Sequence, residues 1–126
     1  ATASTAIKAG TQQDLVVNVG DRIFFDLDKY SVRVNQRSHL DKQAAWMKAN
    51  PSVTVAVEGH CDERGTREYN LALGERRASA ARDYLIAFGM DPARVTTTSY
   101  GKERPYALGH NEESWSLNRR SVTVVN

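Results

Sequence analysis

Residues 53–88 read "VTVAVEGHCDERGTREYNLALGERRASAARDYLIAF" and hold the clearest structural signals in the chain. Val53, Val55 and Val57 alternate with other residues, which is the period of a strand with one buried face. From residue 67 to residue 88 the small and apolar residues recur at helical spacing instead. A strand followed closely by a helix is typical of a βα unit, so this stretch indicates an α/β fold.

Two residues bound the predicted helix. The Thr66 hydroxyl can accept a backbone N–H of the first turn, and Gly89 suits the C-terminal cap. Gly74 lies on the inner side, where its missing side chain would let the helix approach the sheet closely. The expected buried stripe comprises Leu71, Ala78, Ala81, Leu85 and Phe88.

The flanking segments add further strands and one more helix. Two short β-rich runs over 14–30 favour a hairpin. The segment 34–50 has helical spacing and stops before Pro51, because the residue before a proline avoids the α region. Strands are predicted over 93–101 and 121–125, with a polar segment between them. This order predicts a two-layer α/β sandwich: a four-stranded mixed sheet, which the hairpin could extend, with two main helices packed on one face.

The length of 126 residues suits one domain with a single core. Residues 1–13 are small and polar and are interpreted as a flexible tail or linker, and residues 14–126 as the folded domain. No apolar run approaches the roughly 20 residues that a membrane-spanning helix needs, and no signal peptide is visible. The lone Cys61 excludes an internal disulfide.

Positive charge is spread along the chain rather than gathered in one stripe. The formal net charge is +2. Acidic residues alternate with the arginines of the central segment, and no aromatic platform for stacking bases accompanies them: Arg64, Arg67, Arg76, Arg77 and Arg82. We therefore expect a solvated helix face and no nucleic-acid partner.

Four adjacent loop residues could each bind a metal ion: His60, Cys61, Asp62 and Glu63. A zinc site needs four ligands that converge on a tetrahedron, usually from two separated pairs. Adjacent side chains project in diverging directions, and the remaining histidines belong to no paired motif. We expect neither a metal ion nor another cofactor.

The neighbouring His60 and Cys61 also invite a thiolate nucleophile. A catalytic cysteine and histidine normally meet from distant parts of the chain, with a third group that orients the pair. No such signature is present here. We interpret Cys61 as a small residue packed near the end of a strand.

A charged ligand could be held by the loop and the helix together. Asp62 directly follows the predicted strand, where α/β sheets place binding residues. Asn70, Leu73 and Arg77 are three and four residues apart, so they share one helix face. Arginine can hold a carboxylate and aspartate an ammonium group, which would suit a zwitterionic amino-acid terminus. The same residues could instead pair with each other or with other side chains, and the sequence leaves both possibilities open.

The distance along the helix tests this idea. Arg77 lies about 16 Å along the axis from Thr66, at the usual rise per residue. Its side chain points back toward the N-terminus, and Gly59 and Gly65 could let the loop fold back along the helix. A shared pocket is therefore feasible without being required.

The stretch "VEGHCDERGTREYNLALGERRASAARDYL" resembles the signature of OmpA-like peptidoglycan-binding domains, which runs Gly-His-Thr-Asp, then Gly, then Asn-x-x-Leu-Ser-x-x-Arg-Ala. Within that family, "FFDLDKY", "SYGKERPYALGH" and "NRRSV" resemble the peptidoglycan-associated lipoproteins of Gram-negative envelopes. The resemblance covers residues 20–126. Cys61 replaces the usual threonine or alanine, and Gly74 replaces a frequent serine.

The resemblance implies an α/β sandwich that binds the meso-diaminopimelate side chain of the peptidoglycan stem peptide without catalysis. By position it implies that five residues contact the ligand: Asp62, Arg77, Asn70, Leu73 and Asp28. It implies a supporting place for five others: His60, Cys61, Leu27, Asn118 and Arg119.

The resemblance also implies partners and a location. It implies that the domain tethers the outer membrane to the cell wall within the Tol-Pal system, in envelope integrity and cell division, with the β-propeller protein TolB as a partner. The location would be the periplasmic face of the outer membrane, through a lipid-anchoring cysteine upstream of Ala1. The alternative is a protein-interaction module whose main role is binding TolB, with weak affinity for the wall.

Overall fold

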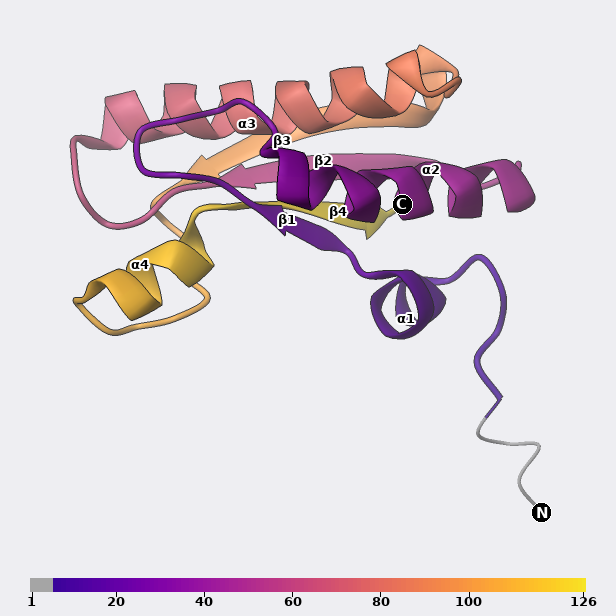
Figure 1. Cartoon of the computed structure of the whole chain (residues 1–126), viewed down its shortest axis with the longest axis horizontal. Coiled ribbons are helices and arrows are strands. Elements are labelled where there is room, and N and C mark those ends of the chain that lie inside the picture. Colours follow the sequence, from indigo (N-terminus) through magenta and orange to yellow (C-terminus); the bar gives the residue numbers. More distant parts are fainter. Residues whose placement is uncertain (1–5) are drawn as a thin grey trace.

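The computed structural model describes residues 6–126, which form a mixed sheet with two long helices packed on one face (Figure 1). In this part of the chain the sheet has four strands in the order β1-β4-β2-β3. β2 runs parallel to β3, whereas β4 is antiparallel to both β1 and β2. The predicted two-layer α/β sandwich with a mixed sheet is thus confirmed. The strands are β1 (Arg22–Phe24), β2 (Val55–His60), β3 (Val95–Gly101) and β4 (Arg120–Val125).

The two long helices cover different parts of the sheet, with α3 over the β2–β3 side and α2 toward β1. The long helices are α2 and α3, and α3 packs on β2 and β3. None of the helices in residues 6–126 combines the length and apolar character that crossing a membrane requires. The helical elements are α1 (Gln12–Asp14), η2 (Leu15–Val19), η3 (Val34–Gln36), α2 (Arg37–Ala49), α3 (Arg67–Ala87), η4 (Pro92–Arg94) and α4 (Glu112–Asn118).

The core lies between the sheet and the two long helices. Val55 and Val57 of β2 are fully buried, as their alternation predicted, and Ile23 of β1 lies on the same face. Burying one such side chain stabilises the fold by about 1.5–3 kcal/mol. The helices meet this face with Leu40, Ala44, Met47, Ala78, Ala81 and Leu85.

Helix α3 begins and ends as its sequence predicted. The Thr66 hydroxyl accepts the Tyr69 N–H at 3.1 Å, and Gly89 has a φ of 111° beyond the last turn. The predicted buried stripe is wrong at both ends, because Leu71 is only half-buried and Phe88 caps the helix and is 42% exposed. The buried face instead includes polar residues near the N-terminal half, Asn70 and Arg77 among them.

The predicted hairpin over 14–30 is wrong. Residues 12–19 are helical, and only Arg22–Phe24 forms a strand, which pairs with β4. The Asp14 carboxylate accepts the Trp46 indole N–H at 2.7 Å, and Leu15 is fully buried. These contacts hold the segment against α2 and outweigh the strand propensity of its valines.

The division into a tail over 1–13 and a domain over 14–126 stays a prediction, and residues 1–5 lie outside the described residues. The Gln12 side chain contacts the C-terminal strand. Its amide oxygen accepts the Val125 N–H at 2.6 Å, and its amide nitrogen donates to the Thr123 carbonyl at 3.4 Å.

A second helix was missed in the polar segment between β3 and β4. Helix α4 starts at an Asn111 cap, whose side chain accepts the Ser114 N–H at 3.0 Å. Asn118 ends it and accepts the N–H groups of Tyr106 and Ala107 at 2.7 and 2.9 Å. This amide side chain ties the preceding loop to the helix.

Strand β2 and helix α3 approach each other closely at two glycines. A Cβ added to Gly59 would overlap the backbone carbonyl oxygen of Gly74. One added to Gly74 would meet the Ser99 hydroxyl and lie 3.0 Å from the Gly59 oxygen. The predicted role of Gly74 in close approach is therefore confirmed, and Gly59 is its counterpart on the strand.

We predict that Gly59→Ala lowers the free energy of unfolding by at least about 2 kcal/mol, because the new methyl group meets backbone that has nowhere to move. Gly74→Ala should cost less. Its methyl group meets a serine hydroxyl that can rotate away, and alanine gains about 1 kcal/mol of helix propensity. Urea unfolding of both variants measures this order, and a Gly59→Ala protein as stable as Gly74→Ala would contradict it.

Candidate ligand-binding site

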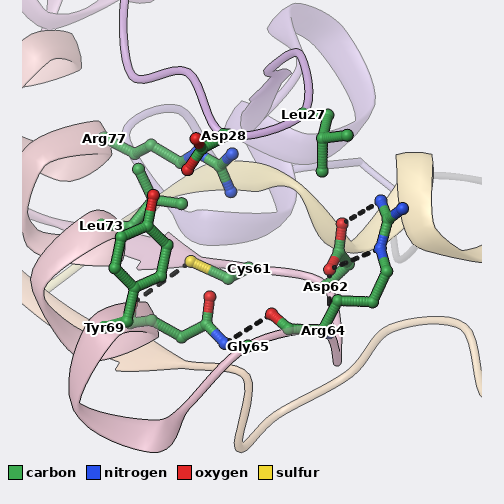
Figure 2. A pocket seen from close by; sticks show the side chains of 10 residues that line it. Leu27, Asp28, Cys61, Asp62, Arg64, Gly65, Tyr69, Leu73 and Arg77 are labelled. Atoms are coloured by element: carbon green, nitrogen blue, oxygen red, sulfur yellow. Dashed lines mark hydrogen bonds and ion pairs between the residues drawn. The ribbon is translucent and has the colours of Figure 1, made fainter.

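A pocket of about 330 Å³ lies where the end of β2 meets the N-terminal half of α3 (Figure 2). Its size suits a small organic group. The structure brings together most of the predicted site residues here: Leu27, Asp28, Cys61, Asp62, Asn70, Leu73 and Arg77. Three residues that the sequence analysis did not assign complete the lining: Arg64, Gly65 and Tyr69.

Asp62 is a buried carboxylate surrounded by donors. Its side chain is 5% exposed. Oδ1 accepts the Arg64 backbone N–H at 3.0 Å and the Arg64 Nε–H at 3.3 Å. Oδ2 accepts from Nη2 of Arg64 at 2.8 Å and from Nη1 of Arg119 at 3.4 Å. Burial raises the pKa of Asp62, but the hydrogen bonds from Arg64 and Arg119 outweigh it and hold the pKa below its ordinary value. Asp62 is therefore ionised at neutral pH.

Arg77 is 1% exposed and braces the loop that precedes η3. Its guanidinium donates to the carbonyls of Lys29, His60 and Asp26 at 2.8, 3.0 and 3.1 Å. A guanidinium has five N–H groups, so two are left for a ligand. Burial lowers the pKa of Arg77, although an arginine stays charged at neutral pH.

Asp62 and Arg77 form no ion pair with each other among the described residues. Asp62 pairs with Arg64 and Arg119 instead. The sequence left open whether Asp62 and Arg77 pair with each other or with other side chains. In the ligand-free protein Asp62 pairs with other side chains. Both charges still line the same pocket, so a ligand can meet them together.

The loop on the other side of the pocket presents an acid and an apolar side chain. Asp28 has a φ of 59°, in the left-handed region, which aspartate tolerates better than most residues. The bonds from Arg77 to the carbonyls on either side of it fix this conformation. Leu27 is 54% exposed and Tyr69, across the pocket, is 48% exposed. The pocket mouth is therefore partly apolar (Figure 2).

Cys61 and Asn70 pack together in the wall of the pocket. The Cys61 thiol donates to the Asn70 carbonyl at 3.3 Å, and the Asn70 amide donates to the Arg64 carbonyl at 2.9 Å. Burial raises the pKa of the Cys61 thiol to about 11. A thiol with that pKa is protonated at neutral pH and is a poor nucleophile.

The predicted supporting residues His60, Asn118 and Arg119 do not line the pocket. His60 stacks on Tyr100 at 5.5 Å between ring centroids. Asn118 holds the loop before α4. Arg119 reaches Asp62 from outside the pocket, while its Nε–H donates to the Phe25 carbonyl at 3.0 Å. Their side chains contact the elements around the pocket, and their supporting role stays a prediction.

The sequence analysis missed the residues that accompany Asp62. Arg64 lies two positions after Asp62, a spacing typical of a local turn closed by the aspartate side chain, and this could have identified it. Tyr69 precedes Leu73 by four residues and so shares its helix face. No comparable signal marks Trp115 of α4, whose ring lies 4.0 Å from the Arg64 guanidinium carbon.

Within residues 6–126 no group of three or more histidine, cysteine, aspartate or glutamate side chains is placed to hold a metal ion. The side chains of the "HCDE" run face different surroundings. Glu63 pairs with His110 at 2.7 Å, whereas Asp62 lies inside the pocket with its arginines.

Residues 24–119, which include the strand end, the loop and the helix that build this pocket, match the OmpA family. The chain belongs to this family. The sequence signature described for OmpA-like domains therefore has its structural counterpart here, since its Asp, Asn, Leu and Arg positions meet in one pocket.

Relatives within the family carry the name peptidoglycan-associated lipoprotein. One from Rhizobium meliloti is 55% identical over 120 residues, which are 95% of this chain and 68% of the relative. One from Brucella melitensis is 54% identical over 121 residues, which are 96% of this chain and 72% of the relative.

Solved structures of other bacterial proteins share the fold. The crystal structure of the peptidoglycan-associated lipoprotein from Burkholderia pseudomallei matches with a TM-score of 0.81 and 43% identity, over 84% of this chain and 90% of that one. The C-terminal domain of Helicobacter pylori MotB matches with a TM-score of 0.78 at 20% identity, over 84% of each chain, which is a likeness of fold alone.

We predict that buried His60 makes the fold less stable in mild acid. Burial, together with the charges of Arg120, Arg104 and Arg22, lowers the pKa of His60 from 6.5 to about 3. Below pH 6.5 His60 binds a proton in the unfolded chain but stays neutral in the folded chain. The stability that neutral His60 contributes is therefore complete above pH 6.5 and is lost progressively as the pH falls toward 3. Between pH 6.5 and 5 the free energy of unfolding should drop by about 2 kcal/mol from this residue.

Urea unfolding at pH 7 and pH 5 measures this drop. His60→Gln should unfold with a smaller difference between the two pH values, whatever its absolute stability. His39→Gln is the matched control and should keep the full difference. An unchanged pH dependence in His60→Gln would show that another group is responsible.

Proposed function

We propose that this protein binds peptidoglycan without catalysis, and that the pocket holds the meso-diaminopimelate side chain of the stem peptide. The observation that carries the proposal is one pocket lined by two buried, opposite charges, Asp62 and Arg77. The names of the relatives from Rhizobium meliloti and Brucella melitensis support peptidoglycan as the ligand.

The chemistry of diaminopimelate matches the pocket. In an uncrosslinked stem peptide its free stereocentre carries an ammonium and a carboxylate group. Asp62 would accept from the ammonium, and the two N–H groups that Arg77 does not use would donate to the carboxylate. Leu73 and Leu27 would contact the methylene chain between the stereocentres, and Asp28 would lie at the edge.

The surroundings of the reactive groups favour binding over catalysis. The Cys61 thiol is buried, and its pKa of about 11 leaves it protonated. His60 does not line the pocket, and its Nδ1 has no hydrogen-bond partner among the described residues. A thiol enzyme would need an accessible thiolate within reach of a base.

At the cellular level we propose a tether between the outer membrane and the cell wall, on the periplasmic face of that membrane. The word lipoprotein in the relatives' names supports a lipid anchor in the whole protein. TolB and the other Tol-Pal components would be its protein partners, with roles in envelope integrity and cell division. A TolB surface that overlaps the pocket would make wall binding and TolB binding compete.

The second candidate is a module that mainly binds TolB and binds the wall weakly. Exposed apolar side chains near the pocket favour a protein partner, among them Leu27, Tyr69 and Leu108. Sedimentation with purified sacculi, with and without TolB, separates the candidates. If wall binding is the main role, most of the protein should pellet with the sacculi when TolB is absent. If TolB competes for the pocket, less of the protein should pellet when TolB is added.

We predict that Asp62 and Arg77 form a clamp for diaminopimelate. Removing either charge should weaken binding by about 2–5 kcal/mol, because the ligand's opposite charge is left buried and unpaired. This is more than tenfold in affinity. Titration of a diaminopimelate peptide against Asp62→Ala, Arg77→Ala and Arg77→Lys measures it, with exposed Arg76→Ala as the charge-matched control. Arg77→Lys should also bind poorly, because lysine lacks the planar fork.

A change of ligand tests the same clamp without altering the protein, since Arg77 also braces a loop and its variants can disturb the fold. A peptide with lysine in place of diaminopimelate lacks the carboxylate that Arg77 would hold. It should bind the unmutated protein more than tenfold more weakly. Equal affinity for the two peptides would contradict the clamp even if the protein pellets with cell walls.

A further inference from the structure

The Asp62 carboxylate has no free acceptor site in the ligand-free protein. A carboxylate offers about four lone-pair sites on its two oxygens. Here each oxygen already accepts two hydrogen bonds, from the backbone and side chain of Arg64 and from Arg119. An ammonium group that enters the pocket must therefore displace one of these donors.

Arg64 is the donor that can leave. Arg119 is only 7% exposed, and it is held by the Phe25 carbonyl and by Glu112 at 2.7 Å. The Arg64 side chain is 36% exposed. It contributes two of the four bonds to Asp62, through Nε and Nη2. The main chain of Arg64 is anchored separately, because its N–H donates to Asp62 and its carbonyl accepts from Asn70. The side chain can turn while the loop stays in place.

Glu112 and Trp115 offer the Arg64 guanidinium a second position next to the one it occupies at Asp62. The guanidinium carbon is 4.0 Å from the centre of the Trp115 ring, and Nη2 is 3.8 Å from a Glu112 carboxylate oxygen. Glu112 is 64% exposed and also pairs with Arg119 at 2.7 Å, so its carboxylate would accept from both guanidinium groups. If the Arg64 side chain rotates away from Asp62, its guanidinium would exchange the Asp62 carboxylate for that of Glu112. It would still lie over the Trp115 ring.

We propose that Arg64 occupies the cation position of Asp62 when no ligand is bound, and moves toward Glu112 over Trp115 when a ligand ammonium enters. This inference rests on the proposed function, because it takes Asp62 as the acceptor of that ammonium. Arg64 is then a built-in competitor that weakens binding and selects for ligands with a true cation. A ligand without a cation cannot replace it.

The direction of the effect distinguishes this role from an ordinary contact. Removing a side chain that only contacts the ligand would normally weaken binding. Arg64→Gln should instead bind a diaminopimelate-containing muropeptide about two- to fivefold more tightly, the range expected when a part-exposed ion pair no longer has to be broken. Arg67→Gln is the charge-matched control, because Arg67 lies three residues away, is 64% exposed and pairs with Glu103.

Calorimetric titration of the unmutated chain, Arg64→Gln, Arg64→Ala and Arg67→Gln with that muropeptide measures the affinities. Nitrogen-15 NMR of the same titration follows the Arg64 Nε–H and the Trp115 indole N–H. Both signals should shift as the unmutated protein saturates. In Arg64→Gln the indole signal should move much less, because no guanidinium changes its position over the ring.

The two Arg64 variants should bind more tightly than Arg67→Gln, and this result supports the inference. Affinity equal to or weaker than that of Arg67→Gln overturns it, as does an Arg64 Nε–H signal that does not move on saturation. If the unmutated protein fails to bind the muropeptide at all, the proposed function fails first. Thermal unfolding of each variant checks that the fold is intact, since the backbone bonds of residue 64 do not depend on its side chain.

Discussion

The site depends on the contact between Gly59 of β2 and Gly74 of α3, where two backbones touch without side chains between them. This contact sets how deeply α3 sits on the sheet. It therefore brings the helix face that carries Asn70, Leu73 and Arg77 down to the level of the loop that carries Asp62. A side chain at either glycine would lift the helix. A shift of even an ångström would then separate the carboxylate and the guanidinium of the proposed clamp.

Buried charge is the second constraint, and each buried ion in the site is satisfied in its own way. Arg77 is satisfied by backbone carbonyls of the loop before η3 and of the end of β2, so it fixes the walls of the pocket before any ligand arrives. Asp62 is satisfied by two arginines, of which one is held firmly and one is not. This difference gives the pocket a rigid side and an adaptable side. A site arranged in this way loses little order on binding, because most of its charged groups are already positioned.

The sequence predicted the parts of the fold that rest on local signals. The alternating valines of β2, the Thr66 cap and Gly89 bounded the strand and the helix that build the pocket, and the face shared by Asn70, Leu73 and Arg77 placed them correctly. The N-terminal helix could not be predicted, because Leu15 and Asp14 are held by contacts with α2 that no local pattern shows. Helix α4 was hidden in a polar segment, and Trp115 and Glu112 went unnoticed with it. The pairing of Asp62 with Arg64 and Arg119 became clear only from the three-dimensional structure.

The direction of the strands gives the domain a tip and a base. β2 runs toward the pocket and ends there at His60, while β4 runs away from it and ends at Val125. Gln12 bonds to Val125, and the Asn126 N–H donates to the Thr54 carbonyl at 3.0 Å, so helix α1 and the C-terminus lie together at the base (Figure 1). The chain therefore passes the base of the domain both at Gln12 and at Asn126. The pocket lies at the opposite end of the sheet, so these two parts of the chain leave its opening uncovered.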